Sequence, residues 1–233
     1  MPDQVSKANF VIADNLASIK GKIIDAKRAY EALTGIDNSV NLVAVSKRQP
    51  EYRIDAALAA GQRTFGENRV QEAQSRWKNR RVLRKDLTLH LIGPLQTNKV
   101  ADAVALFDVI EVVDRPKLAR ALSIEMSRQN RQLECYVQVN TGEEEQKSGI
   151  APDEANDFIL YCRDEAKLKI TGLMCIPPVY EEASMHFALL KTIAERNGIF
   201  TLSMGMSDDF EEAIAFGANS VRIGSALFGQ REG

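Results

Sequence analysis

Eight short runs of strand-forming residues alternate along the chain with segments of helical periodicity. The run from Leu42 to Val45 is apolar throughout, which is typical of a parallel strand that is buried on both faces. We expect strands at residues 41–47, 64–68, 87–92, 109–113, 134–140, 169–176, 201–204 and 220–223. Eight strand–helix units predict an α/β fold of the (β/α)8, or TIM, barrel type that occupies nearly the whole chain.

The segments between these strands carry the helix pattern. Apolar residues recur at helical spacing over residues 5–34, and Gly35 follows where a C-terminal cap is expected. Further helices are expected at residues 52–60, 69–81, 96–106 and 115–130, and after Asp153. An open doubly wound sheet is the competing architecture, but no G-x-G-x-x-G sequence opens any of the helices. Because no linker or repeat separates the units, we expect residues 1–233 to form a single domain.

Charge and cysteine content restrict the class of function. The formal net charge of −2 and the pI near 5.8 give no general attraction to nucleic acid or to an anionic membrane. No apolar run approaches the length of a membrane span, and the first residues lack the pattern of a signal peptide. Cys135, Cys162 and Cys175 have no paired spacing, which is typical of reduced thiols. We therefore expect a cytoplasmic protein that binds neither nucleic acid nor membrane.

Lys47 is the first candidate for a functional residue. It ends the strand that begins at Asn41, and functional residues of TIM barrels lie at the carboxyl ends of the strands. One interpretation is a lysine whose stem is buried and whose ammonium group reaches solvent. The other is an amine at the barrel mouth that is partly removed from water and can attack a carbonyl group. Features elsewhere in the chain favour the second interpretation.

The loops after the last two strands both combine glycine and serine with a following helix. Gly205 and Ser207 lie in one loop, and Gly224 and Ser225 lie in the other. Glycine lets the backbone approach a ligand, serine adds a hydroxyl group, and a helix N-terminus supplies free N–H groups. Turn and capping chemistry would explain either loop alone. Both together favour a phosphate site, which is common at this place in TIM barrels.

Arg222 precedes Gly224 by two residues, so its guanidinium is expected in or beside the mouth. It could simply form an ion pair with one of the many carboxylates of the chain. As a functional group it only donates hydrogen bonds, and it stays cationic. A reactive lysine, a phosphate cradle and a donor-only arginine together indicate a site for pyridoxal 5′-phosphate (PLP).

Five segments of the chain form a recognisable set. They are Val45–Lys47, Phe65–Asn68, His90–Lys99, Ser203–Ser207 and Val221–Gly224. With these segments the chain resembles the YggS/PROSC family of pyridoxal phosphate homeostasis proteins, over about residues 40–230. The serine-methionine-glycine-methionine-serine segment is the most specific of them. The chain departs from the family in having leucine on both sides of His90, where aromatic residues are frequent, and in having Arg48 after the lysine.

The resemblance implies a barrel of the alanine racemase N-terminal-domain type, and it implies a role for each candidate residue. Lys47 would form the Schiff base with PLP, and Arg222 would face the pyridine nitrogen. Asn68 would lie near the ring. The phosphate would be held by Ser207, Gly224 and Ser225.

Other features of the chain have simpler explanations. His90 and His186 have no cysteine or carboxylate at ligand spacing, so we predict no metal site. The basic run at residues 76–85, which contains Trp77, is interpreted as a solvated helix end where cations complement the helix dipole. Cys175 is interpreted as a small core residue.

Three functions remain in competition. The favoured one is a PLP-binding protein of intracellular PLP homeostasis that holds or delivers the cofactor with little or no turnover, with PLP-requiring apoenzymes as candidate partners. The second is a PLP-dependent amino-acid racemase. The third is an aldolase with Lys47 as its Schiff-base lysine, which would leave Arg222 and the family segments unexplained.

Racemisation requires a base on each face of the substrate. Lys47 could serve one face, and of the five tyrosines only Tyr180 lies near a predicted strand end that opens on the mouth. The chain ends just after its eighth barrel unit, so we expect no second domain to supply the other base. We therefore expect a protein that is not an efficient enzyme, and we expect a monomer.

Overall fold

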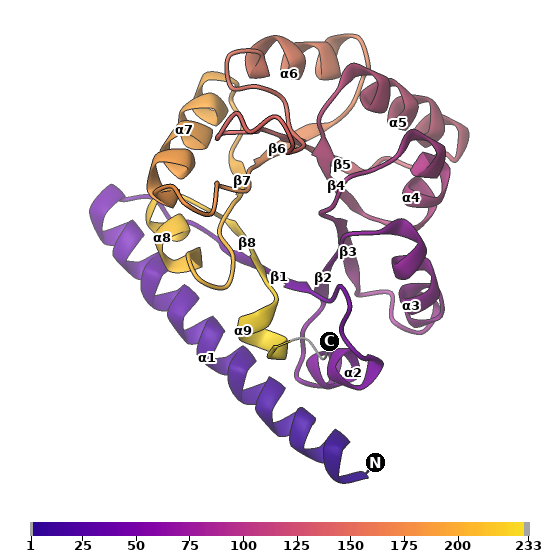
Figure 1. The fold of residues 1–233 in the computed structure, drawn as a ribbon, viewed down its shortest axis with the longest axis vertical. Coiled ribbons are helices and arrows are strands. Elements are labelled where there is room, and N and C mark those ends of the chain that lie inside the picture. Colours follow the sequence, from indigo (N-terminus) through magenta and orange to yellow (C-terminus); the bar gives the residue numbers. More distant parts are fainter. Residues whose placement is uncertain (1, 231–233) are drawn as a thin grey trace.

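Residues 2–230 are described by the computed structural model, with side-chain detail from residue 9 onward. The predicted domain 1–233 also includes residues 1 and 231–233, which lie outside the described residues. Eight parallel strands close into a barrel in chain order, with β8 paired to β1 (Figure 1). The strands are β1 (Asn41–Val45), β2 (Thr64–Glu67), β3 (Thr88–Leu91), β4 (Val109–Val113), β5 (Glu134–Gln138), β6 (Ile170–Met174), β7 (Thr201–Ser203) and β8 (Ser220–Ile223). The predicted TIM barrel is confirmed.

Helices surround the barrel on its outside (Figure 1). They are α1 (Pro2–Thr34), α2 (Glu51–Ala59), α3 (Val70–Leu83), α4 (Val100–Leu106) with the preceding 3-10 turn η1 (Thr97–Lys99), α5 (Pro116–Arg128), α6 (Ala155–Asp164), α7 (Ala183–Arg196), α8 (Phe210–Ala215) and α9 (Ser225–Phe228). Three strands end two residues earlier than predicted. β1 stops at Val45, β5 at Gln138 and β6 at Met174, because the residues that follow have already left the sheet to build the loops of the mouth.

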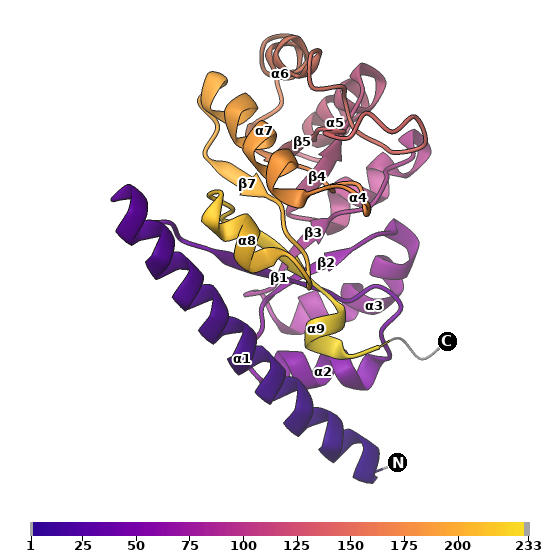
Figure 2. The ribbon, with the colours of Figure 1, turned by 60° about the vertical axis from the view of Figure 1, so that its left-hand side comes forward.

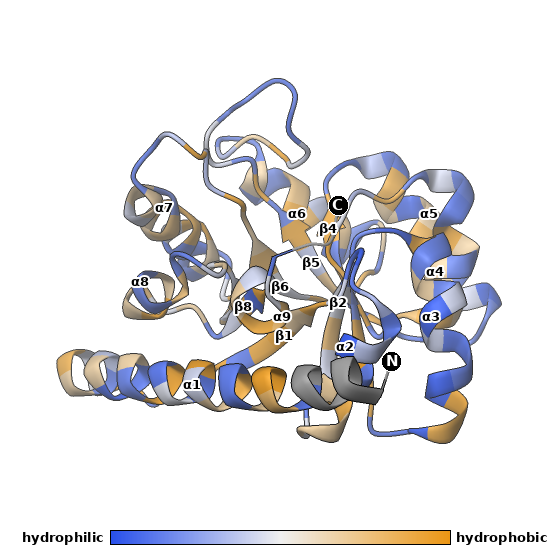
Figure 3. Cartoon of the chain, turned by 60° about the horizontal axis from the view of Figure 1, so that its bottom comes forward, coloured by the Kyte–Doolittle hydropathy of each residue, from blue (hydrophilic) through white to orange (hydrophobic). Residues whose placement is uncertain are grey.

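The long helix α1 lies across the outside of the barrel, against α2, α8 and α9 (Figure 2). The apolar residues of one face, Ile12, Leu16, Ile19 and Ile23, recur every three to four positions and are buried, whereas Phe10, Val11, Ile24 and Leu33 are exposed. Apolar and polar residues alternate along the helix (Figure 3). An ion pair of 2.7 Å between Lys22 and Glu211 adds a polar contact with α8. Gly35 ends the helix with a φ of +70°, and its N–H bonds to the Glu31 carbonyl at 2.8 Å, as a glycine cap requires.

Two different cores result from this arrangement. The layer between the strands and the helices is apolar, as the strand and helix patterns require. The inside of the barrel is partly polar, because it contains buried His90, Glu111, Ser203 and Arg222. These four side chains are connected by hydrogen bonds, and Arg222 places one end of that network beside the loops that follow β6 and β7.

In the part of the chain that the structure describes, no helix is both long enough and apolar enough to cross a membrane. The same residues contain no group of three or more His, Cys, Asp or Glu side chains arranged to hold a metal ion.

Candidate cofactor site

Lys47 lies in the turn between β1 and α2, two residues beyond the end of the strand. The turn is closed by a hydrogen bond of 3.1 Å from the Gln49 N–H to the Ser46 carbonyl. Lys47 lines a pocket of about 320 Å³ together with Gly224 and Ser225. The end of β1 therefore brings the lysine to the start of α9, although 177 residues separate Lys47 from Gly224 (224 − 47).

Arg76 of α3 supports the turn that contains Lys47. Its guanidinium donates to the carbonyls of Ser46 (2.9 Å) and Gln49 (3.0 Å), on either side of Lys47. Arg76 itself pairs with the fully buried carboxylate of Glu67 at 2.8 Å. That carboxylate also accepts hydrogen bonds from the Ser46 hydroxyl (2.7 Å) and the Trp77 indole N–H (2.9 Å).

These contacts correct the interpretation of residues 76–85 as a solvated helix end for Arg76 and Trp77, whereas Lys78, Arg84 and Lys85 are exposed as expected. Trp77 is completely buried, and only 11% of the Arg76 side chain is exposed. Burial works against the charge of Arg76, but the charges and hydrogen bonds of Glu67 and Glu51 together outweigh burial, so the pKa of Arg76 lies above its ordinary value. Arg76 and Trp77 lie inward because the buried Glu67 carboxylate needs a cation and donors nearby.

Ser207 and the turn after β8 form the second part of the site. The Ser207 hydroxyl oxygen accepts hydrogen bonds from the N–H groups of Gly224 and Ala226, both at 3.3 Å. Its loop leaves β7 through Gly205, which has a φ of +90° and lies so close to α8 that a Cβ would approach the Ala213 Cβ to 2.6 Å. Ser207 and Gly224, two of the predicted phosphate residues, thus meet at one turn, where two backbone N–H groups point at the Ser207 hydroxyl.

Arg222 is anchored at the ends of β6 and β7. It is 4% exposed, and it donates to the Cys175 carbonyl and to both the carbonyl and the hydroxyl of Ser203, each at 2.7 Å. These three hydrogen bonds use three of the five guanidinium N–H groups, and the other two have no partner among the described residues. The guanidinium is therefore fixed in place but still able to donate.

A buried carboxylate supports this arginine across the barrel. The Ser203 hydroxyl, which accepts from Arg222, donates to Glu111 at 2.5 Å, and the other carboxylate oxygen of Glu111 accepts from Nδ1 of His90 at 2.5 Å. Burial alone would raise the pKa of Glu111. The hydrogen bond and charge of His90 and the charge of Arg222 outweigh burial, so the pKa of Glu111 lies below its ordinary value.

Asn68 leaves the end of β2 and lines the pocket that lies on the other side of Lys47. It is packed closely against the next loop, since a Cβ on Gly93 would lie 2.5 Å from the Asn68 carbonyl oxygen. Its side-chain oxygen is buried and has no hydrogen-bond partner among the described residues. A ligand with a hydroxyl donor would satisfy this oxygen.

The donor set fits PLP. It combines an amine, a cluster of N–H and hydroxyl donors that suits a phosphate dianion, a fixed guanidinium for a ring nitrogen and an unsatisfied amide oxygen for a hydroxyl. The structure brings together all six predicted residues at the carboxyl-terminal end of the barrel: Lys47, Asn68, Ser207, Arg222, Gly224 and Ser225.

Two other sequence interpretations have clear outcomes. Tyr180, which follows β6, is 99% exposed, and it does not line either pocket at Lys47. Cys175 is fully buried, as expected of a core residue, and burial raises the pKa of its thiol to about 12.

The sequence analysis missed Glu111, Ser203 and Glu67 as parts of the site. Glu111 could have been found, because it is the only charged residue in the apolar strand Val109–Val113.

Comparison with known proteins agrees with this description. The family model for the alanine racemase N-terminal domain matches residues 31–232. A pyridoxal phosphate homeostasis protein of Pseudomonas aeruginosa is 40% identical over 227 residues, which cover 95% of this chain and 96% of the relative. The protein of the same name from Escherichia coli K12 is 38% identical over 236 residues, with 95% and 97% covered.

Solved structures lead to the same family. PipY of Synechococcus elongatus, solved without PLP, superposes with a TM-score of 0.82 at 36% identity and covers 94% of this chain and 100% of its own. PipY with PLP bound gives a TM-score of 0.78 at 35% identity, with the same shares covered. Alanine racemase of Clostridium difficile matches with a TM-score of 0.69 at 13% identity over 58% of its length, which shows the fold alone. The chain therefore belongs to the family of pyridoxal phosphate homeostasis proteins, built on the alanine racemase N-terminal-domain barrel.

Proposed function

We propose that this protein binds PLP covalently through Lys47 and acts in intracellular PLP homeostasis, as a protein that holds or delivers the cofactor with little or no turnover. The observation that carries the proposal is the position of Lys47, on a fixed turn and in one pocket with Gly224 and Ser225. PLP supplies an aldehyde that reacts with amines, together with a phosphate dianion. Its presence in the PipY structure supports the same ligand here.

Each group around the lysine has a proposed task. The hydroxyls of Ser207 and Ser225 donate to the phosphate, and the N–H groups of Gly224 and Ala226, which donate to the Ser207 hydroxyl in this structure, turn to the phosphate when it binds. Arg222 donates to the pyridine nitrogen, and Asn68 accepts a hydrogen bond from the ring hydroxyl.

The same contacts argue against efficient racemisation. Because an arginine only donates, the pyridine nitrogen that it meets stays unprotonated, and the ring is then a weak electron sink. A second base opposite Lys47 is also required. Tyr180 is 99% exposed, and Tyr136 is 5% exposed within the barrel wall, so neither side chain is positioned at the lysine pocket.

We also propose a single-domain monomer in the cytoplasm, with PLP-requiring apoenzymes as recipients of the cofactor. The closed barrel supports one domain. The exposed large apolar side chains of the helices are spread over α1, α3, α5, α6 and α7, which favours a monomer over a dimer with one apolar interface. All three cysteines are free, in keeping with a reducing compartment. Light scattering of the purified protein measures the oligomeric state directly.

The decisive experiment is borohydride reduction of the protein after incubation with PLP, followed by peptide mass mapping. We expect one stable adduct, on Lys47, and none in Lys47→Ala. Lys78→Ala, which changes an exposed lysine of α3, serves as the matched control and should label like the parent. An adduct on another lysine would contradict the site. Turnover of L- and D-amino acids near the enzyme median of about 10 s⁻¹ would contradict the non-catalytic role.

A further inference from the structure

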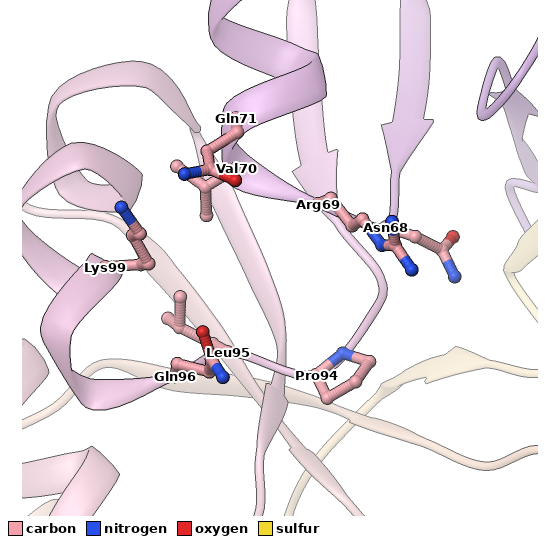
Figure 4. A pocket seen from close by; sticks show the side chains of 8 residues that line it. All are labelled: Asn68, Arg69, Val70, Gln71, Pro94, Leu95, Gln96 and Lys99. Carbon is pink, nitrogen blue, oxygen red and sulfur yellow. The ribbon is translucent and has the colours of Figure 1, made fainter.

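A second pocket, of about 650 Å³, opens on the same end of the barrel, between the loops that follow β2 and β3 (Figure 4). Its lining consists of Asn68, Arg69, Val70, Gln71, Pro94, Leu95, Gln96 and Lys99. Asn68 and Arg69 also line the pocket of about 250 Å³ on the other side of Lys47, which Lys47 forms with Arg48 and Glu72, so these two pockets share a wall. The segment 90–99, which marks the family resemblance, contributes four of these residues, although the proposed cofactor contacts use none of the four.

The lining of this pocket carries positive charge and no negative charge. Arg69 and Lys99 lie on opposite sides of the pocket (Figure 4), and none of its eight lining residues is acidic. Lys99 is half-buried, and no carboxylate of the described residues lies within ion-pair distance of it. Arg69 contacts Glu72 at 3.5 Å, but its side chain is 70% exposed, and such exposed pairs are weak.

Amide groups complete the set of donors. Asn68, Gln71 and Gln96 can each donate two hydrogen bonds from the side chain. Two cations and several amide donors without an acid favour a ligand that carries negative charge. Val70 and Leu95, which are buried, provide apolar walls for its carbon skeleton.

The walls of the pocket are also held in place. The guanidinium of Arg115 donates to the Leu95 carbonyl at 2.8 Å, and the Lys99 N–H bonds to the Gln96 carbonyl at 2.9 Å. The Ile92 N–H bonds to the Glu67 carbonyl at 2.9 Å, which ties the two loops together at their start. A pocket whose backbone is fixed in this way loses little conformational entropy when it binds a ligand.

We propose that this pocket binds a small organic anion, a carboxylate or a phosphate monoester, beside the cofactor on Lys47. The inference extends the proposed function, because the shared wall places this anion next to the molecule that Lys47 holds. Carboxylates and phosphate monoesters share the chemistry that the lining recognises, and the experiment separates them. Neither requires a covalent step.

The test uses protein in which PLP has been fixed to Lys47 by borohydride, so that the lysine pocket is blocked. Isothermal titration calorimetry is then carried out with succinate, with pyridoxine 5′-phosphate, which lacks an aldehyde, and with inorganic phosphate. We expect binding of one equivalent of at least one probe, and the identity of that probe assigns the ligand class. Lys99→Gln and Arg69→Gln should each weaken binding about tenfold, the effect expected of one charge-assisted hydrogen bond.

Lys78→Gln removes an exposed charge of α3 outside the pocket, and it should bind like the parent. The inference is overturned if no probe binds at millimolar concentration, or if all three variants bind equally well. Failure of the borohydride step would instead contradict the proposed function. In that event Lys47→Ala is titrated with succinate only, because the empty lysine pocket is itself proposed to bind phosphate. Binding that Lys99→Gln and Arg69→Gln weaken supports the inference, and absent binding or equal binding in these variants overturns it.

Discussion

The hydroxyl group of Ser203 donates a hydrogen bond of 2.5 Å to the carboxylate of Glu111 across the inside of the barrel. Ser203 lies on β7 and Glu111 on β4, and β5 and β6 separate these strands in the wall. Because the same hydroxyl accepts a hydrogen bond from Arg222, the network joins the guanidinium to a buried negative charge. The barrel thus fixes the position of the Arg222 guanidinium, the group proposed to contact the pyridine nitrogen, and the Glu111 carboxylate balances its positive charge.

Replacing Glu111 with glutamine should destabilise the protein at neutral pH. The variant leaves the buried charge of Arg222 without its compensating carboxylate, which typically costs about 3 kcal/mol. The folded-state pKa of Glu111 lies below the ordinary 4.5, so the ionised carboxylate stabilises the fold above that pH, and the contribution is lost as pH falls through the lower folded-state pKa. The difference in unfolding free energy between parent and variant should therefore shrink in acid.

Urea unfolding at neutral and at acid pH measures this difference. If the difference in unfolding free energy between parent and variant stayed constant from neutral to acid pH, the carboxylate charge would not be what stabilises the network.

Replacing Ser207 with alanine should weaken PLP retention about ten- to a hundredfold, the range that one charge-assisted hydrogen bond of about 1.5–3 kcal/mol implies. Labelling of Lys47 by borohydride at saturating PLP should persist, because the lysine is untouched. Equilibrium dialysis with PLP and with pyridoxal gives the comparison, and Ser75→Ala on the exposed side of α3 is the control. If pyridoxal were retained as strongly as PLP by the parent, the phosphate assignment would be wrong.

Replacing Glu67 with glutamine should destabilise the protein by about 3 kcal/mol, because Arg76 would then lose its buried counter-ion and keep only the exposed carboxylate of Glu51 at 3.2 Å. Glu211→Gln breaks an exposed ion pair with Lys22 and should have a much smaller effect. Trp77 is the only tryptophan and contacts Glu67, so its fluorescence follows unfolding. Equal effects of the two substitutions would contradict the proposed importance of the buried pair.

The three cysteines should be unreactive in the native protein. All are buried, and burial raises the pKa of Cys162 and Cys175 to about 12 and raises the pKa of Cys135 as well. Since the thiolate is the reacting species, Ellman's reagent at mildly alkaline pH should detect almost no thiol until the protein is unfolded, and then three. A thiol that reacts rapidly in the native protein would show that this part of the core opens.

The architecture and the position of the lysine could be predicted from the sequence alone. Strand runs and helical periodicity are local signals, so the eight units and the glycine cap at Gly35 could be recognised without any long-range contact. The order of strands in a TIM barrel then brings Lys47 and Gly224 to one end of the molecule. Their proposed roles in PLP binding came from the combination of residue types and from the family segments.

Only the tertiary structure decided how charges are paired inside the protein. Glu111 and Ser203 are 92 positions apart, and no local pattern indicates that their side chains meet. Arg76 belongs to a basic run that local reasoning assigns to solvent, but the buried Glu67 carboxylate draws it inward to support the lysine turn. The physical reason is the same in both cases. The free energy of a buried charge depends on the atoms that surround it, and closure of the barrel determines which atoms those are.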